Sequence, residues 1–196
     1  MNLIKKLGNK FIWLGIYLSP AGERKNWFLR KVCCHIGKGS KLLGYQFGAE
    51  PYLLWIGDNV IAAVGTSFIE HDASYFNVYR YLGKKFIGTG GKMGGIIVRN
   101  NVFIGAGSMI FGGADIGENS IIAAGSIVNK KIPPNEVWGG IPAHFIMSID
   151  EYAKKVVKHE EKLPWIKSGE YKDISEQELI KKRQNYYLKS ILEEYL

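Results

Sequence analysis

Aliphatic residues recur at every sixth position between Val98 and Pro133. The positions are Val98, Ile104, Ile110, Ile116, Ile122 and Val128. A period of six fits neither an isolated α-helix, which has about 3.6 residues per turn, nor a simple strand, whose side chains alternate with a period of two. It is typical of a parallel β-helix, in which each hexapeptide forms one short strand and one turn. The sequence therefore predicts an all-β core whose aliphatic residues stack in a narrow interior.

The residues between these aliphatic positions favour tight corners. A small or β-branched residue follows each of them four places later, and turn-forming pairs such as Asn100-Asn101 and Ala124-Gly125 lie between. Small residues and residues that tolerate left-handed backbone suit the corners of a coil. The predicted coil runs through residues 35–147.

Four stretches near the end of the repeat resemble the hexapeptide-repeat acyltransferases. They are residues 104–108 (IGAGS), 116–120 (IGENS), 124–128 (AGSIV) and 139–143 (GGIPA). The resemblance implies a left-handed parallel β-helix of triangular section. This handedness does not follow from the period, and it runs against the general preference for right-handed parallel crossovers.

The repeat is irregular in two places. Ile36 and Ile56 are separated by twenty residues, two more than a triangular coil of eighteen, so we expect Ile36 to lie beneath Ile56 with a bulge near Gly48 to Pro51. Between Phe68 and Val98 the pattern fails, and residues 73–96 are predicted to be a loop that leaves the coil and returns. Loops of this length are usually functional. The glycine-rich run 90–95 does not have the order of a phosphate-binding P-loop.

Helical patterns lie on both sides of the coil. Residues 2–18 predict an amphipathic helix within an N-terminal helical segment, residues 1–34. Its apolar stripe is Leu3, Ile4, Leu7, Phe11, Leu14 and Leu18. Packing of this stripe against the β-helix or a neighbouring subunit is one interpretation, and peripheral membrane contact is the other. A helical extension, residues 148–196, contains capping boxes at Ser148 and Ser175 and is expected to cover the open end of the coil.

Composition limits the remaining possibilities. The net charge is +8, from 26 basic and 18 acidic residues, which favours anionic partners. No recognition motif predicts nucleic-acid binding, and no apolar run approaches the length of a membrane span. Cys33 and Cys34 are adjacent, a poor geometry for a disulfide, which agrees with a cytoplasmic location.

His71 is the candidate catalytic residue. It lies where a repeat strand breaks into the predicted loop, a position that resembles that of the family's catalytic histidine. The resemblance implies a general base that takes a proton from an acceptor hydroxyl as the oxygen attacks acetyl-CoA. The orienting residue stays open between Glu70 and Asp72, although neighbours on a strand point to opposite faces. Asp72 and Glu50 are the predicted acceptor-binding residues, with capping of the loop as the alternative role of Asp72.

The resemblance also implies a coenzyme A groove between the subunits of a homotrimer. The predicted cofactor-binding residues are Ala106, Ala124, Asn129, Lys130, Lys131 and His144. His144 occupies a place where the family commonly has lysine or arginine, so phosphate recognition is expected to depend on the lysine pair. No metal is expected to be required.

The predicted function is acetyl-CoA-dependent O-acetylation of a sugar hydroxyl. The stretches 47–53 and 68–72 most resemble enzymes of bacterial capsule or lipopolysaccharide assembly, with the galactoside, maltose and streptogramin acetyltransferases close in pattern. An acetyltransferase of an antibiotic or an amino sugar is the alternative. A γ-carbonic-anhydrase-like metalloprotein is disfavoured, because zinc in that class needs three histidine ligands and the repeat region offers only His71 with the distant His35 and His144.

Overall fold

The computed structural model describes residues 3–44, 46–85, 92–169 and 174–193, without the side chains of residues 3–9 and 190–193. Residue 2 of the predicted N-terminal helix and residues 86–91 of the predicted loop therefore lie outside the described residues, as do the side chains of Leu3, Ile4 and Leu7 in the apolar stripe. The chain divides into two compact units, Met1–Ile149 and Asp150–Leu196.

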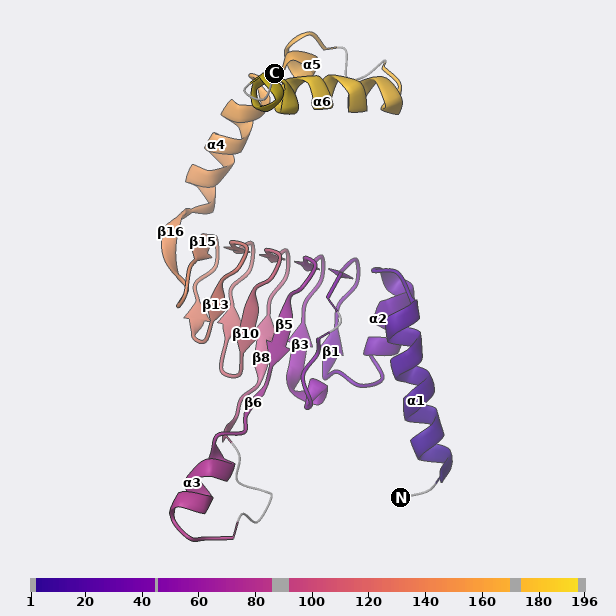
Figure 1. Cartoon of the computed structure of the whole chain (residues 1–196), viewed down its shortest axis with the longest axis vertical. Coiled ribbons are helices and arrows are strands. Elements are labelled where there is room, and N and C mark those ends of the chain that lie inside the picture. The colour runs from indigo at the N-terminus through magenta and orange to yellow at the C-terminus, as the bar shows by residue number, and fades with distance from the viewer. Residues whose placement is uncertain (1–2, 45, 86–91, 170–173, 194–196) are drawn as a thin grey trace. The chain divides into compact units, whose positions relative to one another are not determined.

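The first unit contains a parallel β-helix, in which successive short strands fall in turn on three sheets (Figure 1). Sheet 1 contains β1 (His35–Ile36), β3 (Leu54–Ile56), β8 (Ile96–Val98), β11 (Asp115–Ile116) and β14 (Lys131–Ile132). Sheet 2 contains β5 (Ser67–Ile69), β10 (Met109–Phe111) and β13 (Ile127–Val128). Sheet 3 contains β2 (Lys41–Leu42), β4 (Ile61–Ala62), β9 (Phe103–Ile104), β12 (Ile121–Ile122), β15 (Glu136–Gly139) and β16 (His144–Ser148). Within these three sheets, the described neighbouring strands are parallel except β16, which is antiparallel to β15.

The register of the strands stacks the repeated aliphatic residues, as predicted. Ile110 pairs with Phe68 on one side and Val128 on the other, and all three side chains are buried. Because each coil places its aliphatic residues above those of the coil before, the interior is continuous and apolar. Ile36 pairs with Ile56, which confirms the longer first coil. The extra residues lie where a bulge was predicted, around the short 3₁₀ helix η1 (Pro51–Leu53).

Stacked asparagines form one corner of the coil. Asn59, Asn101, Asn119 and Asn135 all have positive φ, between 56° and 62°. The Nδ2 of each of the first three donates to the Oδ1 of the next, at 3.2, 3.1 and 2.9 Å. Asparagine tolerates this left-handed conformation better than other residues with a side chain. The turn-forming pairs in the sequence thus form a hydrogen-bonded ladder along this edge.

The predicted loop, residues 73–96, lies within a segment that leaves the coil after β5 and returns at β8; this segment is called the excursion. It starts and ends in an antiparallel pair, β6 (His71–Asp72) with β7 (Lys92–Met93). The sequence pattern predicts a loop here, but the interior contains helix α3 (Tyr75–Tyr81). Tyr75 and Tyr79, four residues apart, are its partly buried side chains on one helical face. Because only these two residues mark the buried face, helix α3 is too short to be recognised from the periodicity of the sequence.

Helices α1 (Leu3–Leu18) and α2 (Glu23–Leu29) precede the first coil. Buried side chains of α2 donate to backbone carbonyls at the open edge of that coil. The Lys25 Nζ lies 3.0 Å from the Leu42 oxygen and 3.2 Å from the Gly44 oxygen, and the Asn26 Nδ2 lies 2.8 Å from the Ser40 oxygen. These bonds satisfy carbonyls that have no strand beneath them.

The second unit is helical, with α4 (Ile149–Glu160), α5 (Pro164–Lys167) and α6 (Glu176–Glu193). The first residue of α4, Ile149, is also the last residue of the first unit. The predicted capping box at the start of α6 is present, because Ser175 Oγ accepts from the Glu178 N–H at 3.3 Å and Glu178 Oε2 accepts from the Ser175 N–H at 3.0 Å. Coverage of the coil by this unit stays a prediction. Among the described residues, no helix is long and apolar enough to cross a membrane.

Candidate active site

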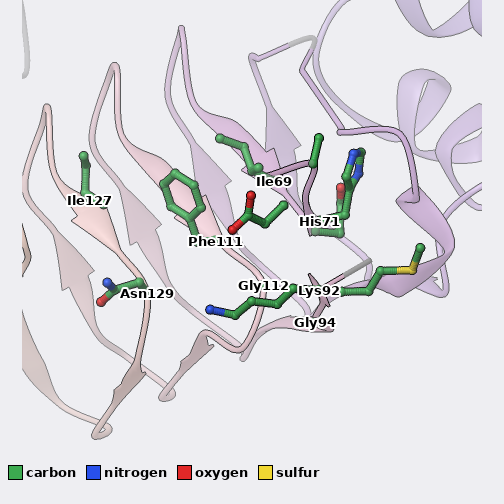
Figure 2. Close-up of a pocket in the computed structure, with 12 residues that line it drawn as sticks. Ile69, His71, Lys92, Gly94, Phe111, Gly112, Ile127 and Asn129 are labelled. Atoms are coloured by element: carbon green, nitrogen blue, oxygen red, sulfur yellow. The ribbon is translucent and has the colours of Figure 1, made fainter. Parts of the chain in front are cut away.

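A cavity of about 430 Å³ lies on the outer side of sheet 2, at the corner where its strands end. Figure 2 shows Phe111 and Ile127 on the coil side of this cavity and the β6–β7 pair, with His71 and Lys92, on the other. Ile69 completes the apolar side of the lining. The site therefore combines an apolar wall from the coil with a polar wall from the base of the excursion.

His71 and Glu50 form a close pair at the edge of this cavity. The His71 Nδ1 lies 2.5 Å from the Glu50 Oε2, and the two side chains are 35% and 17% exposed. Segment 46–50 runs beside β5, since Gln46 pairs with Ser67 in a parallel bridge. Gln46 and Ser67 are twenty-one residues apart, and so are Glu50 and His71. The bulged coil thus brings the carboxylate to the imidazole.

The pair fixes which ring nitrogen of His71 is available for proton transfer. A carboxylate can only accept a hydrogen bond, so the imidazole proton belongs on Nδ1 and the lone pair on Nε2. A neutral imidazole held in this tautomer has the properties of a general base.

The sequence does not predict the contact between Glu50 and His71. The sequence predicts that Glu50 binds the acceptor, and it leaves the residue that orients His71 open between Glu70 and Asp72. The only signal in the sequence was the lengthened first coil, because a spacing near twenty residues places a residue after Gly48 beside the strand that leads to His71.

Asp72 caps the start of the excursion. Its Oδ1 accepts a hydrogen bond of 2.9 Å from the Ser74 N–H, and this bond is the main reason that the pKa of Asp72 is lowered. Asp72 also lies opposite Lys92 across the β6–β7 pair. In Figure 2 the Lys92 side chain extends along the cavity toward Asn129, and it therefore brings a positive charge into the site.

Glu70 lies next to His71 in the chain and is a buried part of the lining of the same cavity. It is 1% exposed, and neither carboxylate oxygen has a hydrogen-bond partner among the described residues. Burial raises the pKa of Glu70, and the negative charge of Glu50 acts in the same direction. Gly48, with φ of 62°, makes room for it, because a Cβ there would lie 1.7 Å from the Glu70 Oε2.

Among the predicted cofactor-binding residues, Asn129 lines the cavity with His71. Ala106 and Ala124 are exposed at the opposite ends of the same strands, just before β10 and β13. Lys130 is exposed beside Asn129.

Two further predicted cofactor residues lie away from the cavity. Lys131 belongs to sheet 1, where it pairs with Asp115. His144 lies in β16, with its Nδ1 3.5 Å from the Pro142 oxygen. One chain therefore brings Asn129 to His71 but leaves Lys131 and His144 on other surfaces.

The described residues contain no group of three or more histidine, cysteine, aspartate or glutamate side chains arranged to hold a metal ion. Cys33 and Cys34 are both free thiols. Burial raises the pKa of Cys33 to about 12, so its thiol is a poor nucleophile.

The chain is similar in sequence to several known proteins, although no family model matches it. It is 34% identical to protein CapG of Staphylococcus aureus over 134 residues, which cover 67% of this chain and 75% of CapG. It is 36% identical to the galactoside O-acetyltransferase of Escherichia coli K12 over 105 residues, which cover 54% of this chain and 49% of the relative. The chain thus matches about half the length of the second protein.

Solved structures share the fold. A hexapeptide-repeat-containing acetyltransferase from Vibrio cholerae superposes with a TM-score of 0.55 at 22% identity, over 76% of this chain and 94% of the other. Galactoside acetyltransferase in complex with coenzyme A also gives a TM-score of 0.55, at 24% identity, over 76% of this chain and 83% of the other. The common architecture is the hexapeptide-repeat β-helix that the period of six predicted.

Proposed function

The chain belongs to the hexapeptide-repeat acetyltransferase family, as its repeat and motifs indicated, and we propose that it transfers an acetyl group from acetyl-CoA to a hydroxyl group of a sugar. The observation that carries this proposal is the His71–Glu50 pair at a cavity between the coil and its excursion. Such a pair supplies the general base that an acceptor hydroxyl requires.

In the proposed reaction, the Nε2 of His71 removes the proton of the acceptor hydroxyl while the oxygen attacks the thioester carbonyl. Glu50 holds the ring through Nδ1 and stabilises the imidazolium that forms. The proton then passes to the leaving thiolate, so the products are the acetyl ester and coenzyme A. The Lys92 ammonium and the apolar wall formed by Phe111 place positive charge and low polarity near the reacting carbonyl.

The corners before β10 and β13 fit the thioester arm of acetyl-CoA. Ala106 and Ala124 have only methyl side chains, and a Cβ added at Gly107 or Gly125 would meet nothing within 4 Å. This edge is therefore open and exposes mainly backbone, which suits a pantetheine chain that bonds to amides. In the proposed complex, Asn129 and Lys130, which are exposed at the other ends of the strands, contact the cosubstrate nearer the cavity.

The acceptor side of the site is the excursion. β6 and β7 form its base, and α3 carries exposed or partly exposed aromatic side chains, Tyr75, Phe76, Tyr79 and Tyr81. Aromatic faces stack on the apolar faces of sugars. We place the reaction in bacterial cell-surface polysaccharide assembly, on the cytoplasmic side, on the strength of the sequence motifs around Glu50 and His71.

The reaction is tested by incubating the protein with acetyl-CoA and a panel of free sugars, nucleotide sugars and lipid-linked glycans, followed by mass spectrometry. The expected result is one added acetyl group on a sugar that mild alkali removes, as an ester requires. An alkali-stable acetyl group on an amino sugar would instead indicate N-acetylation. Absence of transfer to every acceptor, with coenzyme A release no faster than in buffer, would contradict the proposal.

The proposed assembly is a homotrimer. In one chain the cavity and the Ala106–Ala124 edge are both open on the outer side of sheet 2. A neighbouring subunit would supply the second wall of the cosubstrate groove and bring surfaces such as those of Lys131 or His144 to it.

A further inference from the structure

Helix α1 carries an apolar stripe that is exposed in the folded chain. Phe11 is 69% exposed, Leu14 51% and Leu18 75%. These three residues lie on one helical face, at spacings of three and four. Exposure of large apolar side chains in a continuous row is typical of a surface that binds something else.

This stripe is not the face that attaches α1 to the protein. The opposite side of the helix packs on α2 and the coil, where Ile16 is completely buried and Ile12 and Trp13 are partly buried. Gly15 allows the close approach, since a Cβ there would lie 2.4 Å from the ring of Phe28. The expectation that the stripe packs against the β-helix is therefore wrong for its described residues, and the helix is held by a second face that the periodicity did not single out.

Positive charge is concentrated around the same helix. Residues 1–31 contain seven basic residues and one acidic residue, Glu23, and so carry six of the eight net positive charges. In contrast, residues 150–196 contain ten basic and ten acidic residues. Within α1 every charged residue is a lysine: Lys5, Lys6 and Lys10. Lys10, Arg24 and Lys31 are exposed.

We propose that α1 docks on an anionic lipid surface, with the side chains of Phe11, Leu14 and Leu18 among the acyl chains and the ammonium group of Lys10 at the headgroups. Apolar insertion and attraction to anionic lipid are the two terms that hold interfacial helices. A second copy of this chain would bring a like-charged helix to the stripe, which disfavours self-association there. The inference does not depend on acetyl transfer.

The test uses the full chain and sucrose-loaded vesicles, made of phosphatidylcholine alone or of equal parts phosphatidylcholine and phosphatidylglycerol. The protein should sediment with the anionic vesicles, remain largely in the supernatant with the neutral ones, and dissociate as salt is raised. The triple variant Phe11→Gln, Leu14→Gln, Leu18→Gln should lower the fraction bound by about tenfold or more. Its circular dichroism should match that of the parent.

A matched control places the same substitutions on exposed apolar residues of the C-terminal helices, Val156→Gln, Val157→Gln and Ile180→Gln, which are 38%, 53% and 46% exposed. This control should bind vesicles like the parent. A second variant, Lys5→Glu, Lys6→Glu, Lys10→Glu, keeps the stripe and should lose binding to anionic vesicles, so the proposal can be tested even if the triple glutamine variant does not fold.

Three results would overturn the proposal. One is a parent protein that stays in the supernatant with both kinds of vesicle. Another is a triple glutamine variant that binds as the parent does. The third combines two measurements: the parent does not bind vesicles, and light scattering gives the triple variant a lower molecular mass than the parent. That result would make the stripe an interface between copies.

Discussion

The pairing of Glu50 with His71 has a kinetic consequence. Glu50→Gln removes the carboxylate that accepts the Nδ1–H bond, and the amide allows the other tautomer, with the lone pair on the wrong nitrogen. We expect kcat to fall by about 10²-fold with KM for acetyl-CoA nearly unchanged. Nitrogen-15 NMR of the imidazole should show the Nδ1–H tautomer in the parent and a mixture in the variant. An unchanged kcat together with an unchanged tautomer would remove Glu50 from this role.

Glu70 should make stability depend on pH. Burial raises the pKa of Glu70 in the folded state, so the folded protein binds this proton more tightly than the unfolded chain does. The stability contributed is present in full below the unfolded pKa, about 4.3, and is lost as pH rises through the folded value. Glu70→Gln cannot ionise, so it should be more stable than the parent at neutral pH, with the difference shrinking as the solution is acidified.

Urea denaturation at several pH values measures this difference. The exposed Glu118→Gln serves as the matched control and should follow the parent at every pH. A Glu70→Gln variant that is less stable than the parent at neutral pH would show that the ionised carboxylate is stabilised by its surroundings.

The sequence predicts His71 as a candidate base and does not predict its contact with Glu50, which the structure shows. A histidine at the end of a repeat strand is visible because the repeat stops there. The Glu50 contact depends on the bulge between Gly48 and η1, whose position sets a register of twenty-one rather than eighteen residues. The sequence shows that extra residues are present, but it does not show at which corner they are accommodated.

Among the elements, the excursion should be separable from the coil. Asp72 and Lys92 lie opposite each other in an antiparallel pair, so a two-residue Asn-Gly turn in place of residues 73–91 would close a hairpin in the favoured geometry. The shortened protein should fold and bind coenzyme A within a few-fold of the parent. It should lose most acetyl transfer to the sugar, because the aromatic side chains of α3 are removed.

Thermal melting, coenzyme A titration and turnover measured on the same preparation check this expectation. Turnover equal to that of the parent would show that the acceptor binds elsewhere. Loss of coenzyme A binding in a folded variant would place the excursion on the cosubstrate side.

The elements differ in how far the sequence predicts them. The parallel coil follows from the period of six, since a burial pattern that repeats at this period is typical of a parallel β-helix. Helix α1 was also predicted, but its contact face was not. An apolar stripe indicates that a face is buried somewhere. Ile16 and Gly15 lie on the packed face, where the absence of a Cβ at Gly15 lets the ring of Phe28 approach the backbone.

For the whole molecule, the proposed homotrimer predicts a mass in solution of about three chains. Light scattering at working concentration, with and without coenzyme A, measures it. A monomer that turns over at the full rate would contradict a groove with walls from two subunits. Because contacts between copies leave no periodic signal in one chain, the repeat alone could not place the residues that form this groove.

The most direct test of the account compares turnover and cosubstrate binding in the parent and His71→Ala, with His159→Ala, on the second unit, as the matched histidine control. The account predicts that His71→Ala lowers kcat by about 10²–10⁴-fold, that its Kd for coenzyme A by calorimetry stays within a few-fold, and that the control is unchanged. Full turnover by a correctly folded His71→Ala protein would contradict the assignment of His71 as the base.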